Sequence, residues 1–299
     1  MTESLIPPAF AEQIVRREGA AGRAWLDSVP GLVRRFCRQW ALTVDGRPQH
    51  GYAGLILPVS RAGDAAVLKL SWLDEETRDE PVALSTWHGD GAVLLLESDA
   101  SGVMLLERLD SDRMLDDEPI DFAVETAGRL LRRLAVPAPA GLRRTMRGAA
   151  SRWAEQLPAT WDRLGRPLPR ALLETAVELC RTLGPEAGSL LVNEDLHYEN
   201  VLAGTREPWL VIDPKPVAGD LEFGVIPLLW NRMEESTLDD RLAALVAVAG
   251  LDAELARAWT LVRAVVNFLW AVEADDGFAA SLLEIAQWSA TLDGDAPRH

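Results

Sequence analysis

The distribution of apolar residues divides the chain into a mixed first third and a mainly helical remainder. Between residues 9 and 42, apolar side chains recur at helical spacing: Trp25, Leu26, Val29, Leu32, Val33, Phe36 and Trp40. Short apolar runs bounded by turns then predict β-strands at 51–59, 65–70, 92–97 and 103–107. From Pro119 on, the spacing predicts helices at 122–134, two within 148–183, and further ones at 225–231, 238–249 and 253–273. The pattern therefore predicts an α+β protein, and 299 residues are enough for two lobes.

Three short β runs interrupt the helical region and surround a polar loop. The second and third runs, 201–203 and 209–212, are separated by turn residues that include glycine and proline. If these two runs pair as an antiparallel hairpin, Asn200 and Asp213 meet at its open end. Asp195 lies at the end of the preceding loop, so three oxygen-bearing side chains are predicted to converge.

That convergence suits phosphoryl transfer. The reaction needs a carboxylate to accept the proton of the attacking hydroxyl, and it needs hard oxygen ligands for Mg²⁺. In the kinase arrangement Asp-x-x-x-x-Asn is followed by a second Asp; the first Asp is the base, and the other two residues hold metal. The alternative is a solvated loop whose Asp and Asn only cap turns.

Composition and charge narrow the class of protein. The net charge is −16, from 30 basic and 46 acidic side chains, and such a field repels nucleic acid and anionic membranes while it attracts cations. No apolar run approaches 18 residues, the first residues do not resemble a secretory signal, and the two cysteines are far apart. We therefore expect a cytoplasmic monomer that binds neither nucleic acid nor membrane.

Lysine is rare in this chain. Only Lys69 and Lys215 are lysines, and all other basic residues except histidine are arginine. A lysine that persists in so arginine-rich a chain indicates a place where a compact point charge is needed. Lys69 lies inside the apolar run 65–70, where a charge is costly unless it is paired; a solvent-facing strand position is the alternative.

The segment after Lys69 offers several acidic partners. Ser71 and Asp74 resemble a capping box, which predicts that a helix begins there. The acids on this helix are Glu75, Glu76 and Glu80. Pro81 disfavours helical geometry at Glu80, so the sequence leaves the choice between Glu76 and Glu80 open.

The central motifs resemble those of the aminoglycoside phosphotransferases. The matching segments are Asp195–Leu202, Ile212–Pro216 and the pair Gly219-Asp220. They are most similar to the streptomycin 6-kinase and hydroxyurea kinase branch, which has Asp-Pro where protein kinases have Asp-Phe-Gly. The resemblance implies a bilobal protein-kinase-like fold, with a nucleotide-binding lobe at 1–108 and a mainly helical catalytic and substrate-binding lobe at 109–299.

The resemblance also implies roles for individual residues. Asp195 is expected to be the catalytic base, with Asn200 and Asp213 as the Mg²⁺ ligands. Lys69 is expected to contact the α- and β-phosphates of ATP and to pair with a glutamate, for which Glu80 best matches the family position.

Two further features concern the nucleotide. By position alone, the hinge between the lobes falls at Glu107–Leu109, and backbone groups of Glu107 and Leu109 are expected to bind adenine. The turn near Gly51 and Gly54 could cover the phosphates with backbone N–H groups, or it could be plain strand structure, since a G-x-G-x-x-G pattern is lacking.

The implied acceptor is a small cationic antibiotic, of which streptomycin, phosphorylated at its 6-hydroxyl to give resistance, is the expected case. Carboxylates in the helical lobe are expected to hold its guanidinium groups. The candidates for substrate binding are Glu199, Glu222, Asn267, Trp270 and Glu273. Of these, Asn267 and Trp270 share one face of the helix at 253–273 with Arg263.

The chain departs from the family pattern at two positions. Asn193 stands two residues before Asp195, where the family usually has histidine, and Gly224 stands where it commonly has aspartate. Neither departure removes a base or a metal ligand. Two other hypotheses remain: a kinase for hydroxyurea or a metabolite, and a catalytically inactive kinase-like binding protein.

Overall fold

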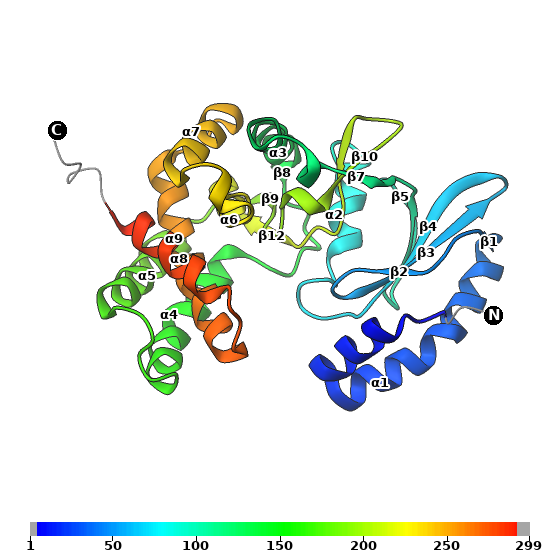
Figure 1. The fold of residues 1–299 in the computed structure, drawn as a ribbon, viewed down its shortest axis with the longest axis horizontal. Coiled ribbons are helices and arrows are strands. Elements are labelled where there is room, and N and C mark those ends of the chain that lie inside the picture. The colour runs from blue at the N-terminus through cyan, green and yellow to red at the C-terminus, as the bar shows by residue number, and fades with distance from the viewer. Residues whose placement is uncertain (1–4, 292–299) are drawn as a thin grey trace.

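A six-stranded antiparallel sheet forms the N-terminal lobe of the computed structural model, which describes residues 5–291 (Figure 1). The strands lie in the order β1–β3–β4–β6–β5, and β2 also pairs with β3. Their bounds are β1 Leu42–Val44, β2 Gln49–His50, β3 Gly54–Arg61, β4 Asp64–Ser71, β5 Leu95–Asp99 and β6 Val103–Glu107. The sheet therefore contains the strands that the apolar runs predicted.

Helix α1, Pro8–Gln39, packs along one face of this sheet (Figure 1). The backbone of Gly19 is not helical, with φ 61° and ψ −132°, so α1 consists of two helical segments that meet at a kink. The buried residues of α1 form one cluster with alternate residues of the strands, including Leu68 and Leu70. Because successive side chains of a strand point to opposite faces, Lys69 is directed away from α1.

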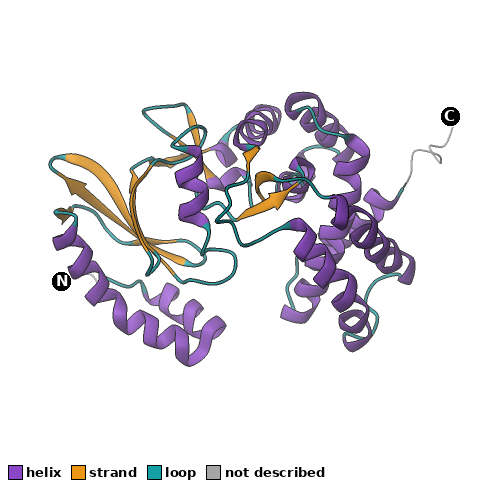
Figure 2. Ribbon diagram, turned by 180° about the vertical axis from the view of Figure 1, so that it is seen from behind, coloured by secondary structure: helices purple, strands orange, loops and turns teal. Residues whose placement is uncertain are grey.

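Helices and two small sheets form the C-terminal lobe (Figure 2). The sheets have the orders β11–β10–β7 and β12–β9–β8. Their strands are β7 Asp110–Met114, β8 Val136–Pro137, β9 Leu190–Asn193, β10 Val201–Ala203, β11 Trp209–Val211 and β12 Pro216–Gly219. The helices are α3 Ile120–Leu134, α4 Met146–Arg163, α5 Arg170–Leu183, α6 Ile226–Trp230, α7 Leu238–Ala249, α8 Ala253–Ala274 and α9 Ala279–Ala290. The bilobal α+β class is confirmed, and the boundary between residues 108 and 109 stays a prediction.

Helix α8 is apolar and long because it is the central helix of this lobe. An 18-residue window within it has a mean hydropathy of 1.3, enough for a membrane span by length and composition alone, but 67% of that window is buried in the protein. The helix packs against α9 and α5, and Trp259 is fully buried within it. Its composition is therefore that of a core helix.

The segment after β4 differs from the sequence prediction. The capping box proposed at Ser71 is wrong, because Ser71 is the last residue of β4 and Asp74 instead accepts backbone hydrogen bonds from Glu76 and Thr77 in a turn. Helix α2, Glu80–Trp87, begins later. Pro81 thus lies in its first turn, where proline is tolerated because the N–H it lacks has no partner within the helix.

Several elements were not expected from the sequence: the short strands β1, β2, β8 and β12, strand β7, and helix α9. The polar segment after residue 108 contains strand β7, which pairs with β10, and its exposed residues lack the apolar alternation that marks a strand. Helix α9 follows α8 and packs against it. Strand β7 is stabilised by pairing with β10, which lies far along the chain, whereas α9 packs against the helix directly before it.

Gly224 lies where the fold leaves little room for a side chain. A Cβ at this position would be 2.8 Å from the Leu131 Cδ1 atom and 3.1 Å from the Asn193 carbonyl oxygen. The aspartate that is common here in the resembling family would require Leu131 and the Asn193 backbone to shift, so glycine suits the packing of this chain.

We expect Gly224→Asp to lower the free energy of unfolding by about 1–3 kcal/mol, because the added atoms overpack a close contact. The matched control is Gly277→Asp, since a Cβ at Gly277 has nothing within 4 Å. Urea unfolding of the two variants checks this, and equal midpoints would show that the packing around Gly224 adapts.

Candidate active site

The predicted hairpin is present and brings the polar side chains together. Strands β10 and β11 pair with Val201 opposite Val211, and the Ile212 N–H donates to the Asn200 carbonyl (2.9 Å). The Asn200 side-chain amide donates to the Asp195 carbonyl at 3.2 Å. Asp213 follows the hairpin with a positive φ of 49°, a conformation that turns the chain sharply after β11. The convergence of Asp195, Asn200 and Asp213 is therefore as predicted.

Lys69 is buried and held between two carboxylates. Its Nζ atom lies 2.6 Å from Glu80 Oε1, 2.8 Å from Glu80 Oε2 and 2.8 Å from Asp213 Oδ1. The choice that the sequence left open is resolved, because Glu80 rather than Glu76 pairs with Lys69. This network connects β4, α2 and the hairpin.

The charges in this network shift each other's proton affinity. Burial by itself lowers the pKa of Lys69, but Asp213 and Glu80 outweigh it and the pKa is raised. Burial raises the pKa of Glu80 to about 7, against the opposing effect of Lys69. One cation thus faces two carboxylates, and burial favours the protonated form of Glu80.

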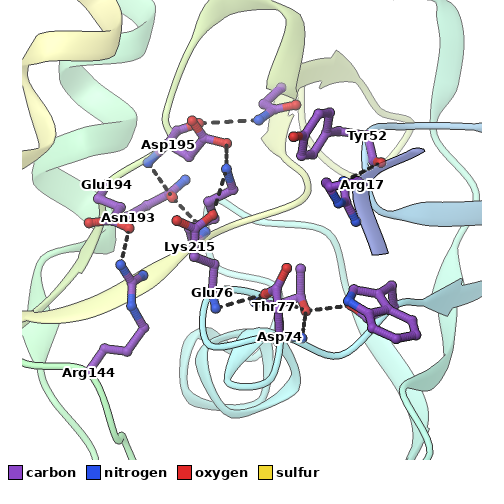
Figure 3. A network of polar contacts seen from close by, with 12 residues as sticks. Arg17, Tyr52, Asp74, Glu76, Thr77, Arg144, Asn193, Glu194, Asp195 and Lys215 are labelled. Carbon is purple, nitrogen blue, oxygen red and sulfur yellow. Dashed lines mark hydrogen bonds and ion pairs between the residues drawn. The ribbon is translucent and has the colours of Figure 1, made fainter. Parts of the chain in front are cut away.

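Lys215 forms a second network of the same kind (Figure 3). Its Nζ atom lies 3.1 Å from Glu76 Oε2 and 3.2 Å from Asp195 Oδ2. Burial lowers the pKa of Lys215, but Asp195 and Glu76 outweigh it and raise the pKa to about 12. The two lysines of the chain therefore lie in one cleft, each between a glutamate of the N-terminal lobe and an aspartate of the catalytic segments.

Asn193 organises the loop in place of the usual histidine. Its Oδ1 atom accepts the backbone N–H of Asp195 at 3.1 Å and that of Lys215 at 3.0 Å. A neutral histidine ring offers only one acceptor nitrogen, whereas the amide oxygen accepts both bonds. Asn193 thus ties the Asp195 loop to the segment that carries Lys215.

Three cavities surround these groups. The apolar cavity, about 360 Å³, is lined by Glu107 and Leu109 together with apolar side chains that include Ile56, Val67, Val93, Leu106, Met114 and Ile212. The central cavity, about 330 Å³, contains Lys69, Glu80, Asp195, Asn200 and Asp213 under the turn at Gly51–Gly54. The helical-lobe cavity, about 430 Å³, is lined by Tyr52, Glu76, Arg144, Trp153, Glu194, Asp195, Lys215, Trp230, Arg263, Val266, Asn267 and Trp270.

The predicted substrate-binding residues are not all found at one place. Asn267 and Trp270 line the helical-lobe cavity, and Glu199 lines the central and apolar cavities. Glu222 instead accepts the Asp252 N–H at 3.0 Å, at the start of α8. Glu273 Oε1 lies 2.7 Å from Nη1 of Arg163 in α4, and both side chains are exposed. Glu222 and Glu273 therefore do not line the cavity for which they were predicted.

Two of the six charged residues of the helical-lobe cavity, Arg144 and Glu194, were not expected from the sequence, and Arg263 was expected there only as a residue that shares a helix face with Asn267 and Trp270. Arg263 is buried, donates to the carbonyls of Glu194 (2.8 Å) and Phe223 (3.2 Å), and lies 4.8 Å from the Phe223 ring centre. Arg144 pairs with Glu194. The sequence signal was weak: Arg263 interrupts an otherwise apolar stretch of α8, but nothing local marks Arg144 or Glu194.

The turn over the central cavity is fixed by α1. The Tyr52 carbonyl accepts hydrogen bonds from Gln13 Nε2 at 2.9 Å and from Arg17 Nη1 at 3.1 Å. The Arg17 guanidinium also lies 4.4 Å from the Tyr52 ring centre. The first segment of α1 thereby holds Tyr52 at the edge of both the central and the helical-lobe cavities.

Comparison with known proteins gives consistent matches over most of the chain. A family described as aminoglycoside/hydroxyurea antibiotic resistance kinase matches residues 39–277. The hydroxyurea phosphotransferase of Kitasatospora aureofaciens is 45% identical over 90% of this chain and 80% of its own length. The streptomycin 6-kinase of Streptomyces glaucescens is 41% identical over 92% of each chain.

Solved structures agree on the fold. An aminoglycoside phosphotransferase, crystallised as a thermostable mutant with ADP and hygromycin B, superposes with a TM-score of 0.60. It is 14% identical, and the match covers 86% of this chain and 96% of that one. The likeness extends through both lobes.

We expect the stability of Glu80→Gln relative to the wild type to depend on pH. Because the pKa of folded Glu80 is raised from 4.5 to about 7, the folded protein keeps a proton that the unfolded chain releases. The wild type therefore loses stability relative to the variant as the pH rises from about 5 to 8, by on the order of 1–3 kcal/mol. Urea unfolding at several pH values measures this gap.

Glu12→Gln, at an exposed position of α1, is the matched control for the loss of one carboxylate. A gap between the wild type and Glu80→Gln that is the same at pH 5 and pH 8 would refute the raised pKa.

Proposed function

Because the chain belongs to the aminoglycoside/hydroxyurea antibiotic resistance kinase family, we propose that it transfers the γ-phosphoryl group of ATP to the 6-hydroxyl of streptomycin. The enzyme is a phosphotransferase of the protein-kinase-like fold that acts on an alcohol group. The observation that supports this proposal most directly is the position of Asp195, which lines both the central and the helical-lobe cavities. In the cytoplasm, where ATP is available, the reaction would modify the antibiotic and give resistance.

The nucleotide is proposed to occupy the apolar and central cavities. Adenine fits among the apolar side chains beside the backbone of Glu107 and Leu109. The phosphates then extend into the central cavity, where Lys69 binds the α- and β-phosphates and Glu80 holds the Lys69 side chain in place.

Mg²⁺ is proposed to bind Asn200 and Asp213, whose donor set fits the ion. Carboxylate and amide oxygens are the ligands that Mg²⁺ takes. The Asn200 amide nitrogen is engaged by the Asp195 carbonyl, so its oxygen is the atom left to bind metal. In Asp213, Oδ1 contacts Lys69 while Oδ2 faces Gly51, 3.5 Å from where a Cβ would lie. When bound, the ion neutralises charge on the nucleotide phosphates.

In the proposed reaction Asp195 accepts the proton of the acceptor hydroxyl. The hydroxyl oxygen forms a bond to the γ-phosphorus while the bond from that phosphorus to the β–γ bridging oxygen breaks, and ADP leaves. Asp195 can take this role because its carboxylate faces the cavity, while Asn193 and Asn200 hold its backbone.

Streptomycin is the proposed acceptor for reasons of both relationship and chemistry. Two streptomycin 6-kinases, from Streptomyces glaucescens and Streptomyces griseus, are each 41% identical over 92% of both chains. The helical-lobe cavity is lined by Trp153, Trp230 and Trp270, and aromatic rings attract cations. Glu76 has a side chain that is 40% exposed, so it can bind a guanidinium group.

Hydroxyurea is a second candidate acceptor, favoured by the charge balance of the same cavity. Its three carboxylates, Glu76, Glu194 and Asp195, are matched by the cations Arg144, Lys215 and Arg263. This balance differs from the carboxylate-dominated site that the sequence analysis predicted. Within residues 5–291, Arg144 Nη1 and Asn267 Nδ2 are buried donors without a hydrogen-bond partner. Such donors suit a carbonyl oxygen. An inactive binding protein is disfavoured, because Lys69, Asp195, Asn200 and Asp213 share one site.

We expect the wild type to phosphorylate streptomycin with ATP, and Asp195→Asn to lower kcat by roughly 10²–10⁴-fold, because proton acceptance is lost while size is kept. A coupled ADP-release assay with streptomycin, hydroxyurea and hygromycin B, followed by mass spectrometry of the product, measures this. Turnover of hydroxyurea but not streptomycin would select the second candidate. Unchanged turnover by a folded Asp195→Asn variant would remove the role assigned to Asp195.

The metal proposal makes a separate prediction. Asn200→Ala and Asp213→Ala are expected to raise the Mg²⁺ concentration needed for half-maximal activity by roughly tenfold or more, because each loses one ligand. Lys69→Ala should instead raise KM for ATP at saturating Mg²⁺. Identical Mg²⁺ titrations for the wild type and both ligand variants would place the metal elsewhere.

A further inference from the structure

Lys215 has no role in the chemistry described so far, although its surroundings are those of a reacting centre. Its Nζ atom touches Asp195 at 3.2 Å and Glu76 at 3.1 Å, and its side chain is 28% exposed. Lys69, by comparison, has a side chain that is only 5% exposed. Lys215 instead presents part of its side chain to open space.

That space is the junction of two cavities. Tyr52, Asp195 and Lys215 each line both the central cavity, which holds the proposed phosphate-binding groups, and the helical-lobe cavity, which is the proposed acceptor site. A phosphoryl group that moves from donor to acceptor must cross this junction. Of the three residues, Lys215 is the one that carries positive charge.

The two ion pairs of Lys215 come from different lobes (Figure 3). Glu76 belongs to the turn between β4 and α2 in the N-terminal lobe, whereas Asp195 belongs to the catalytic loop. Glu76 is the more exposed of the two, with 40% of its side chain accessible against 23% for Asp195. The contact with Glu76, which lines the helical-lobe cavity, is therefore the one that a phosphoryl group crossing the junction can replace.

We propose that Lys215 is a catalytic residue that binds the oxygens of the γ-phosphoryl group during its transfer. Resting on the function proposed above, this assigns the ammonium a place beside the atoms that react. As the acceptor oxygen bonds to the γ-phosphorus and the bond to the bridging oxygen of ADP breaks, the ammonium exchanges Glu76 for the phosphoryl oxygens. The proton of the acceptor goes to Asp195, which remains within reach of Lys215, and Lys215 keeps its own protons throughout.

The choice of lysine agrees with this role. A transferring phosphoryl group spreads negative charge over three oxygens, and catalysis depends on cations placed where that charge lies. A compact ammonium on a flexible stem can follow the group across the junction, while a guanidinium is larger and has a fixed planar geometry. Nearly every other basic side chain of the chain is arginine, so the compact ammonium explains why lysine stands at this position.

The decisive measurement does not need an acceptor. Because Lys215 is proposed to bind the γ-phosphoryl group, Lys215→Met should weaken binding of the non-hydrolysable analogue adenylyl imidodiphosphate with Mg²⁺ by roughly tenfold, the loss typical of one charge-assisted contact. Binding of ADP with Mg²⁺ should stay within about twofold, since ADP lacks that group. Isothermal titration calorimetry gives both constants, and retained ADP binding demonstrates that the variant is folded.

Two further variants complete the test. Lys215→Arg should preserve the preference for the analogue over ADP, because the charge remains, yet lower kcat with streptomycin, because the guanidinium is misplaced. Arg152→Met is the matched control: Arg152 is exposed, pairs with Glu75 at 3.3 Å, and does not line the three cavities.

The calorimetric results have two possible outcomes for the role of Lys215. A selective loss of analogue binding in Lys215→Met supports the proposal. Equal weakening of both nucleotides, or no weakening of either, overturns it and reduces Lys215 to an ion-pair partner that positions Asp195. Since streptomycin does not enter the calorimetry, a failure of the proposed acceptor is distinguishable from a failure of the role of Lys215.

Discussion

The structure depends on a buried ammonium that holds three segments of chain together. Lys69 in β4 binds Glu80 at the start of α2 and Asp213 after the hairpin. Removing Lys69 would leave two carboxylates facing each other without a cation, with Glu80 buried, which is far more costly than the ion pair itself is stabilising. The network therefore fixes the sheet, α2 and the metal-binding turn relative to one another, and it defines where the phosphates of a nucleotide must lie.

A second ammonium repeats this arrangement about the catalytic base. Glu76 and Glu80 are four residues apart, and Asp213 and Lys215 are two residues apart, so the two networks run side by side from the N-terminal lobe to the catalytic segments. The Lys69 side chain is 5% exposed and lines the central and apolar cavities, whereas the Lys215 side chain is 28% exposed and lines the central and helical-lobe cavities. Their difference in exposure separates a structural clamp for the nucleotide from a cation that is available to the transferring group.

The two departures from the family pattern have local compensations. Asn193 supplies one oxygen to two backbone N–H groups, and it thereby holds the Asp195 loop against the segment of Lys215. Gly224 lies against the carbonyl of that same Asn193, so the small residue and the asparagine belong to one packing arrangement. Neither change disturbs the groups that are proposed to react.

The sequence by itself determined the fold class, most helices, the hairpin and the convergence of Asp195, Asn200 and Asp213. These follow from periodicity and turn chemistry, which act over a few residues. It also singled out both lysines, through their rarity.

The partners of those lysines were decided only by tertiary structure. Pro81 argued against Glu80, yet α2 begins at Glu80 and tolerates the proline in its first turn. Likewise, one cavity brings together Arg144, Glu194 and Arg263 from three separate segments. Two predicted substrate-binding residues have other partners: Glu222 accepts the Asp252 N–H, and Glu273 pairs with Arg163. Spacing along the chain specifies which side chains share a face of one helix or strand. A contact between two elements depends on how those elements pack, which the local sequence does not specify.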